Sequence, residues 1–223
     1  MVNKCLICGE NCRPRLSFTD ICFMVNRQSQ LCETCSGLFE RIGRKHCPTC
    51  CKVGLELMCS DCKSWFENGV EVSHKALYKY NLAMKDYFSK YKFQGDYLLK
   101  SIFSKELKIY IEKNYEGYTN LVVPNSQSRM ETRGFNQVSS ILADVNIPYI
   151  DILRKCEGKK QSEKTKHQRL ESENQFSLLH IESLPKKILI IDDIYTTGTT
   201  ISQIRKLLHQ HGINDIKSVS IAR

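Results

Sequence analysis

Eight of the twelve cysteines stand in four CxxC pairs, and these pairs constrain the first third of the chain more than any other feature. The pairs are Cys5 with Cys8, Cys32 with Cys35, Cys47 with Cys50, and Cys59 with Cys62. A CxxC turn directs two thiolates toward one ion, and two such turns complete the tetrahedral set of four ligands that zinc prefers. Four pairs therefore predict two structural Zn²⁺ sites.

The spacing leaves the pairing of these turns open. Sequential pairing joins the first turn with the second and the third with the fourth, whereas a cross-braced arrangement joins the first with the third. A disulfide framework is the other use of such cysteines, and a reducing cytosol disfavours it. The apolar residues of segment 1–66 are too scattered to form a core without metal, so we expect zinc to fold this segment.

The length of 223 residues and the 41% hydrophobic content suit one ordinary domain and a smaller one. We place the boundary after Trp65 and Phe66, which gives a Cys-rich zinc-binding domain at 1–66 and a second domain at 67–223. No segment approaches the roughly 20 apolar residues that span a bilayer, and the N-terminus lacks the apolar core of a signal peptide. We therefore expect a cytoplasmic protein without membrane insertion.

Beyond residue 66 the sequence alternates between strand and helix patterns. Strands are expected at 70–80, 120–124, 147–153, 187–192 and 216–222, and helices at 81–92, 95–115, 135–145 and 199–212. Strands separated by helices indicate a parallel α/β sheet, and the continuous apolar run from Ile188 to Ile191 suits a strand that is covered on both faces.

That buried run ends on two acids in the segment "KILIIDDIYTTGTT", from Lys187 to Thr200. Ligands of parallel sheets bind beyond the carboxyl ends of the strands, which is where Asp192 and Asp193 are expected. The Thr/Gly turn before the next helix offers free backbone N–H groups, hydroxyl groups and the positive end of the helix dipole to a phosphate. The two carboxylates can accept hydrogen bonds from a sugar diol and help to hold a divalent cation. The segment thus predicts a receptor for a sugar phosphate.

The same segment resembles the phosphoribosyl pyrophosphate signature of type I phosphoribosyltransferases. The resemblance implies that Asp192 and Asp193, also the candidate catalytic residues, bind the ribose hydroxyls, with Mg²⁺ accompanying the ligand. It assigns the 5′-phosphate to a loop made of Thr196, Thr197, Gly198, Thr199 and Thr200. A strand that ends on solvated acids before a Thr-capped helix is the alternative interpretation.

Four motifs together resemble the ComF family of late-competence proteins. They are the N-terminal CxxC pairs, "YKFQGD" at 91–96, "RGFNQ" at 133–137 and the signature segment. The resemblance covers nearly the whole chain, and it implies a phosphoribosyltransferase-like domain behind a zinc finger, associated with the uptake of transforming DNA. Other competence proteins are possible partners.

Two further segments can be placed on this frame. The stretch "VVPNSQSRMETRGFNQ" follows an expected strand where phosphoribosyltransferases carry a pyrophosphate-binding loop, so Arg129 and Arg133 are candidate pyrophosphate ligands. The basic segment from Arg154 to Arg169 corresponds either to a mobile loop that closes over pyrophosphate, to a solvated surface loop, or to a contact for nucleic acid. Its candidate contacts for single-stranded DNA are Lys159, Lys160, Lys164 and Lys166.

Two functions follow from these features. In one, the protein binds phosphoribosyl pyrophosphate and Mg²⁺ and assists the uptake or processing of transforming single-stranded DNA. The net charge of +9 favours such a polyanionic partner. In the other, it is a phosphoribosyltransferase that transfers ribose 5-phosphate to a nitrogenous acceptor. Release of pyrophosphate with candidate bases would discriminate between them.

Overall fold

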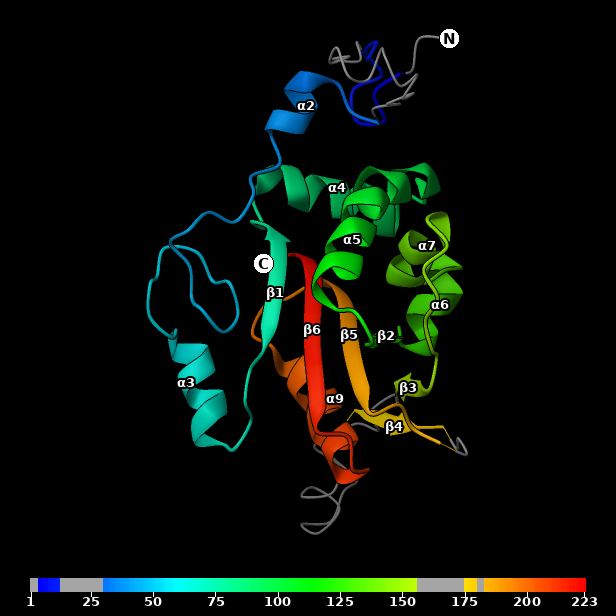
Figure 1. Cartoon of the computed structure of the whole chain (residues 1–223). Helices are drawn as coiled ribbons and strands as arrows, with labels where there is room; N and C mark the ends of the chain where they lie inside the picture. Colours follow the sequence, from blue (N-terminus) through cyan, green and yellow to red (C-terminus); the bar gives the residue numbers. More distant parts are fainter. Residues whose placement is uncertain (1–3, 13–29, 156–174, 180–182) are drawn as a thin grey trace, which may run out of the picture.

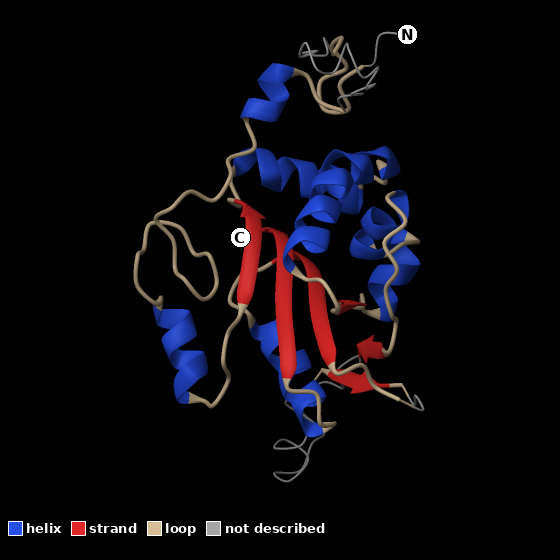
Figure 2. Cartoon of the chain, in the orientation of Figure 1, coloured by secondary structure: helices blue, strands red, loops and turns tan. Residues whose placement is uncertain are grey.

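The computed structural model describes residues 4–12, 30–155, 175–179 and 183–223. Its centre is a four-stranded parallel sheet in the order β1-β6-β5-β2. The strands are β1 (His74–Tyr78), β2 (Thr119–Val122), β5 (Lys187–Ile194) and β6 (Asp215–Ala222). Figure 2 shows this sheet between layers of helices, which confirms the predicted parallel α/β class.

Strand β5 explains how one sheet supports two cores. Ile188, Leu189, Ile190 and Ile191 are fully buried, and successive side chains point to opposite faces. Leu189 and Ile191 join one apolar cluster with α4 (Leu82–Phe93), α5 (Ser101–Asn114) and α7 (Gln137–Asp144). Ile188 and Ile190 join another with α9 (Thr199–Gln210). The apolar run is continuous because both faces of the strand are covered.

Helix boundaries follow local capping chemistry. The Asn81 side chain accepts from the Met84 N–H at the start of α4, and Asn136 accepts from the N–H groups of Val138 and Ser139 at the start of α7. Asn136 Nδ2 also donates to Val123 O at 2.9 Å, which ties α7 to the chain just after β2. These caps hold the helices at the carboxyl end of the sheet.

Three expectations for this domain need correction. The segment 147–153 is not a full strand, because Pro148 has no N–H to donate; Ile150 makes one parallel bridge to Leu121. The chain then forms β3 (Leu153–Lys155), which pairs antiparallel with β4 (Phe176–Leu178). The expected loop before residue 135 contains helix α6 (Gln127–Arg133), and the expected helix at 95–115 begins with a 3₁₀ turn, η1 (Tyr97–Lys100).

In the described residues of the Cys-rich segment, 4–12 and 30–66, the helices are α2 (Glu33–Gly37) and α3 (Ser60–Glu67). In Figure 1 α2 lies near the top of the molecule, and α3 lies beside the sheet at the lower left. Contacts cross the expected boundary at residue 66: Phe39 is buried in the cluster of α4 and α5, and Trp65 packs against the cluster of α9. Within the described part of the chain, no helix has the length and hydropathy to cross a bilayer.

Candidate functional site

The two acids of the signature lie together at the carboxyl end of β5. The Asp193 N–H donates to Asp192 Oδ1 at 2.9 Å, so the backbone fixes the first carboxylate against the second. Burial raises the pKa of Asp192 to about 7, and the neighbouring charge of Asp193 adds to the rise. A divalent cation beside the pair would neutralise both charges, so these oxygens fit the hard ligand set that Mg²⁺ prefers.

A lysine on α4 already contacts this pair. Lys92 Nζ lies 2.6 Å from Asp193 Oδ2, and each side chain is only 14% exposed. The ammonium group also lies 4.7 Å from the centroid of the Phe88 ring. The "YKFQGD" motif therefore contributes a charge to the site through Lys92. From the sequence alone, the same lysine could reach a bound phosphate or belong to an ordinary turn.

The threonine-rich loop connects β5 to α9. Gly198 has φ +86° and precedes the first residue of α9, and no side chain caps this helix. A Cβ at Gly198 would overlap with the Tyr195 hydroxyl group, so both the backbone angle and the space require glycine. The first N–H groups of α9 have no intrahelical partner, which leaves them available to an anion.

A cavity of about 550 Å³ is lined by six of the nine predicted ligand-binding residues. Its lining includes Asp192, Asp193, Thr196, Thr200, Arg129 and Arg133. Thr197, Gly198 and Thr199 belong to the same loop, and the Thr197 and Thr199 hydroxyl oxygens lie 2.9 Å apart. Residues that are far apart in the sequence thus line one cavity.

Cations outnumber acids in this cavity. Five basic side chains line it against two carboxylates: Lys85, Lys92, Arg129, Arg133 and Lys155. Burial lowers the pKa of Lys155, and the nearby charge of Arg129 lowers it further. Excess positive charge in a partly enclosed site favours a ligand with several phosphate groups.

Sequence reasoning missed part of this lining. Lys155 ends β3, whereas the sequence shows it only as one of many cations in a basic segment. Asn125 and Gln137 also line the cavity, as do the aromatic rings of Tyr80 and Phe93. Phe93, Asn125 and Gln137 lie within the quoted motifs "YKFQGD" and "VVPNSQSRMETRGFNQ", but the motifs alone do not show which of their side chains face the cavity.

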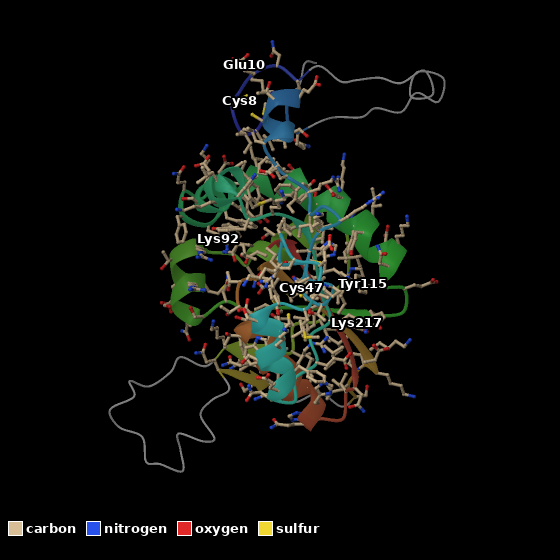
Figure 3. All side chains as sticks on the ribbon, turned by 90° about the vertical axis from the view of Figure 1, so that its left-hand side faces the viewer. Cys8, Glu10, Cys47, Lys92, Tyr115 and Lys217 are labelled. Atoms are coloured by element: carbon tan, nitrogen blue, oxygen red, sulfur yellow. The ribbon has the colours of Figure 1, made fainter. Side chains whose placement is uncertain are left out.

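The eight cysteines form two clusters in sequential order. Cys5, Cys8, Cys32 and Cys35 make the first cluster, and Cys47, Cys50, Cys59 and Cys62 make the second; within each, the sulfur atoms lie within 4.8 Å of one another. Figure 3 shows Cys8 at one end of the molecule and Cys47 near its middle.

The sulfur geometry fits zinc in both clusters. Cys8 Sγ and Cys32 Sγ are 3.7 Å apart, and Cys50 Sγ and Cys59 Sγ are 3.6 Å apart. Four sulfurs at about 2.3 Å from a tetrahedral ion would be roughly 3.8 Å apart, much further than the two atoms of a disulfide. Backbone N–H groups also point at sulfur, as from Cys59 to Cys47 Sγ at 3.3 Å. Both clusters therefore have a donor set that can bind zinc.

Hydrogen bonds favour the thiolate form of one ligand in the second cluster. Burial raises the pKa of Cys47, but the Thr49 hydroxyl group and the backbone N–H groups of Cys59, Thr49 and Cys50 lower it by more, to about 6. The Thr49 hydroxyl oxygen lies 3.1 Å from Cys47 Sγ. A thiolate is the form that binds a metal ion.

The four candidate nucleic-acid contacts lie outside the described residues. Lys159, Lys160, Lys164 and Lys166 all belong to segment 156–174. Their assignment to single-stranded DNA stays a prediction.

Comparison with known proteins agrees with the phosphoribosyltransferase-type fold. The model of the phosphoribosyl transferase domain family matches residues 131–223, which include the signature segment and α9. The chain is 44% identical to a protein named competence protein ComFC from Streptococcus pneumoniae, over 99% of this chain and 100% of the relative. It is 27% identical to the ComFC protein of Bacillus subtilis, over 93% of this chain and 89% of that one.

A solved hypoxanthine phosphoribosyltransferase from Staphylococcus aureus is also similar, with a TM-score of 0.31 and 18% identity, over 54% of this chain and 61% of that chain. The identity to the Streptococcus pneumoniae relative extends from the CxxC pairs through the signature segment, and it decides the assignment. The chain belongs to the ComF family of competence proteins and carries a phosphoribosyltransferase domain.

Proposed function

We propose that this protein binds phosphoribosyl pyrophosphate with Mg²⁺ and assists the uptake or processing of transforming single-stranded DNA in the cytoplasm. The observation that carries the proposal is the convergence of the acid pair, the threonine-rich loop and five cations on one cavity. Each group suits a different part of this ligand, which carries a diol, a monophosphate and a pyrophosphate.

The ligand is assigned to the cavity from its chemistry. Asp192 and Asp193 accept hydrogen bonds from the ribose hydroxyls and share a Mg²⁺ ion with the ligand. The loop from Thr196 to Thr200 binds the 5′-phosphate at the N-terminus of α9. Arg129 and Arg133 pair with the pyrophosphate oxygens, and Lys92 can exchange Asp193 for a phosphate oxygen.

Calorimetry with phosphoribosyl pyrophosphate, with and without Mg²⁺, tests this assignment. Joint replacement Asp192→Asn and Asp193→Asn should abolish Mg²⁺-dependent binding, whereas the melting temperature should hardly change because an amide oxygen can still accept from Lys92. Asp86→Asn is the matched control, since Asp86 is an exposed acid of α4 that pairs with Lys90 at 2.9 Å. Wild-type affinity in the double variant would refute the assignment.

We further propose that both cysteine clusters hold structural zinc. Elemental analysis of the purified protein should find close to two zinc ions per chain. A single ion, or none, would contradict the two-site assignment.

The proposed DNA contact rests on the basic segment and on the relatives, which are named competence proteins. Single-strand binding should weaken steeply with added salt, because each neutralised phosphate releases counterions. Replacing Lys159, Lys160, Lys164 and Lys166 with Gln should reduce the slope of log affinity against log salt by up to about three units, at about 0.7 unit per contact.

The matched control for this slope removes four other lysines and hence the same charge. Lys105, Lys113, Lys186 and Lys206 are all exposed. Their replacement with Gln should leave the slope closer to that of the wild type. Equal slopes in fluorescence anisotropy for the wild type and the loop variant would exclude the segment as a contact.

Turnover is the second candidate function, and the cavity favours it because the acid pair and the cations line the same space. In that reaction the C1–O bond to pyrophosphate breaks as a C1–N bond to the acceptor forms, and the basic side chains stabilise the departing anion. Pyrophosphate release on addition of a nitrogenous base would support the enzyme. Binding without release, across candidate bases, would support a binding protein.

A further inference from the structure

The carbonyl groups of the threonine-rich loop are held from outside the cavity. Arg223 Nη1 donates to the carbonyl oxygen of Thr196 and, at 3.4 Å, to that of Tyr195. Trp65 Nε1 donates to Thr197 O at 2.9 Å. The C=O and N–H groups of one peptide plane point in opposite directions. Fixing these three carbonyls therefore fixes the direction of the N–H groups that follow them.

The same arginine also contacts the loop through the side chain of Tyr195. Its guanidinium group lies 4.7 Å from the centroid of the Tyr195 ring, and that ring stacks on His74 with a centroid distance of 3.9 Å. Tyr195 in turn lies against Gly198, where a Cβ would overlap with its hydroxyl group. Arg223 thus contacts both the backbone carbonyl groups of the loop and the Tyr195 ring, which lies against Gly198.

Both side chains lie next to the second cysteine cluster. Trp65 is on α3, a helix whose N-cap is Cys59 and which contains Cys62. The Arg223 side chain is only 5% exposed, and its Nη2 lies 3.6 Å from the Oδ2 atom of Asp61 on the same helix. Cys59, Cys62 and Tyr195 share one apolar cluster, against which Trp65 packs. The position of α3 therefore decides where the indole N–H meets the loop.

We propose that Trp65 and Arg223 are positioning residues for the threonine-rich loop, and that the second cysteine cluster holds them in place by anchoring α3. The role rests on the proposed binding of phosphoribosyl pyrophosphate. Neither side chain lines the cavity, so each acts on the ligand through the backbone of residues 195–198. The Cys-rich segment then has a function in the phosphoribosyltransferase site itself.

The sequence offers a direct probe, because Trp65 is the only tryptophan of the chain. Its fluorescence in the wild type should change when phosphoribosyl pyrophosphate and Mg²⁺ bind, since the ligand contacts the loop that accepts its N–H. Trp65→Phe keeps an aromatic ring but removes the donor, and should weaken binding by about tenfold in calorimetry, as expected for one hydrogen bond. Ser64→Ala, an exposed neighbour on α3, is the matched control and should bind like the wild type.

A second measurement needs no ligand. Amide hydrogen exchange of residues 195–200 should be faster in Trp65→Phe than in the wild type and unchanged in Ser64→Ala, because the loop has lost a fixed carbonyl. Arg223→Lys keeps the positive charge but cannot reach both carbonyls and the tyrosine ring in the same way. It should likewise exchange faster at these residues, and Arg223→Gln should exchange fastest.

These measurements separate the two proposals. Should the wild type fail to bind phosphoribosyl pyrophosphate, the proposed function is wrong, while the exchange rates still decide whether the loop is positioned by Trp65 and Arg223. Native exchange at residues 195–200 in both Trp65→Phe and Arg223→Lys would overturn the inference. If Trp65→Phe melts far below the wild type, Arg223→Lys alone decides: faster loop exchange at a native melting temperature supports the inference, and native exchange overturns it.

Discussion

The two cysteine clusters have the same ligands but different surroundings. In the first, Cys8 is exposed and Cys32 is half-buried, and the cluster packs with Cys12, Ile7 and Leu31. In the second, all four sulfur ligands belong to residues that are at most 2% exposed, and they share an apolar cluster with β5 and α9. Equal sets of four cysteines therefore lie in a small local cluster in one place and in the domain core in the other.

The helices that leave the clusters explain the difference. The second CxxC turn of each cluster begins a helix: Cys32 is the N-cap of α2, and Cys59 is the N-cap of α3. Helix α2 has five residues, whereas α3 has eight and includes Trp65, whose indole N–H donates to Thr197 O in the threonine-rich loop. About one further helical turn therefore lets α3 connect the second cysteine cluster to the threonine-rich loop.

The largest effect should come from removing one ligand of each cluster in turn. Cys50→Ser should retain about one zinc ion, melt at a much lower temperature and lose binding of phosphoribosyl pyrophosphate. Structural zinc contributes on the order of 10 kcal/mol, which is comparable with the whole stability of a domain. Cys8→Ser should also retain about one ion, but it should keep the affinity of the wild type in calorimetry.

Equal losses of affinity in the two cysteine variants would contradict the expectation that only the second cluster supports the ligand site. Normal binding of phosphoribosyl pyrophosphate by Cys50→Ser would contradict this expectation as well, because the second cluster would then have no part in the ligand site. Elemental analysis of both variants shows whether each has lost the intended ion.

Binding of phosphoribosyl pyrophosphate should depend on pH through Asp192, whereas the first cysteine cluster should have no effect on this dependence. Burial and Asp193 raise the pKa of Asp192 to about 7, so the carboxylate that the ligand needs is lost as the pH falls below 7. Affinity should fall by up to about tenfold per pH unit there. Asp192→Asn should remove this step, leaving only the titration of the ligand's own phosphates. Calorimetry from pH 5.5 to 8 should give the same profile for the wild type and for Cys8→Ser.

The same shift has a consequence for folding. The pKa of Asp192 in the folded protein is above its usual value of 3.8, so the folded state binds the proton more tightly than the unfolded state. Its contribution to stability is therefore most favourable below about pH 4 and is lost as the pH rises to 7. Thermal melts of Asp192→Asn should show a flatter dependence over this range, and an unchanged dependence would contradict the assigned shift.

The sequence predicted the elements that depend on local patterns. The apolar run of β5, the acids after it and the glycine before α9 are adjacent in the chain, so one segment shows strand, carboxylates and turn together. The CxxC pairs likewise show which sulfurs lie close to each other. The pairing between turns needed the structure, which brings them together in sequential order.

The missed features all depend on packing between distant segments. Lys92 reaches Asp193 only because α4 lies over the end of β5, and Trp65 reaches Thr197 across 132 positions of the chain. From the sequence alone, Trp65 could belong to the core or stack on the bases of single-stranded DNA. Its half-buried ring and its bond to Thr197 O give it a structural contact that neither interpretation included.

The clusters should also release metal at different rates. The exposed Cys8 gives a chelator access to the first cluster, whereas the second must open together with part of the domain core. Zinc release to a chromogenic chelator should therefore have two phases that differ on the order of tenfold or more in rate. The slow phase should be absent in Cys50→Ser and the fast phase in Cys8→Ser.

The smallest effect should come from equivalent positions inside the two helical CxxC turns. Asp61 lies just before Cys62 and pairs with Lys52 at 3.1 Å and with Arg223 at 3.6 Å, whereas Thr34 lies just before Cys35 and is exposed. Asp61→Asn should lower stability by less than about 1 kcal/mol, because partly exposed ion pairs contribute little. It should weaken binding of phosphoribosyl pyrophosphate by only a few-fold, roughly what part of one weak ion pair is worth, since Arg223 keeps its bonds to the loop carbonyls. Thr34→Ala should change neither quantity. A loss of affinity in Asp61→Asn as large as that in Cys50→Ser would mean that the ion pair, rather than the anchoring of α3, transmits the second cluster to the loop.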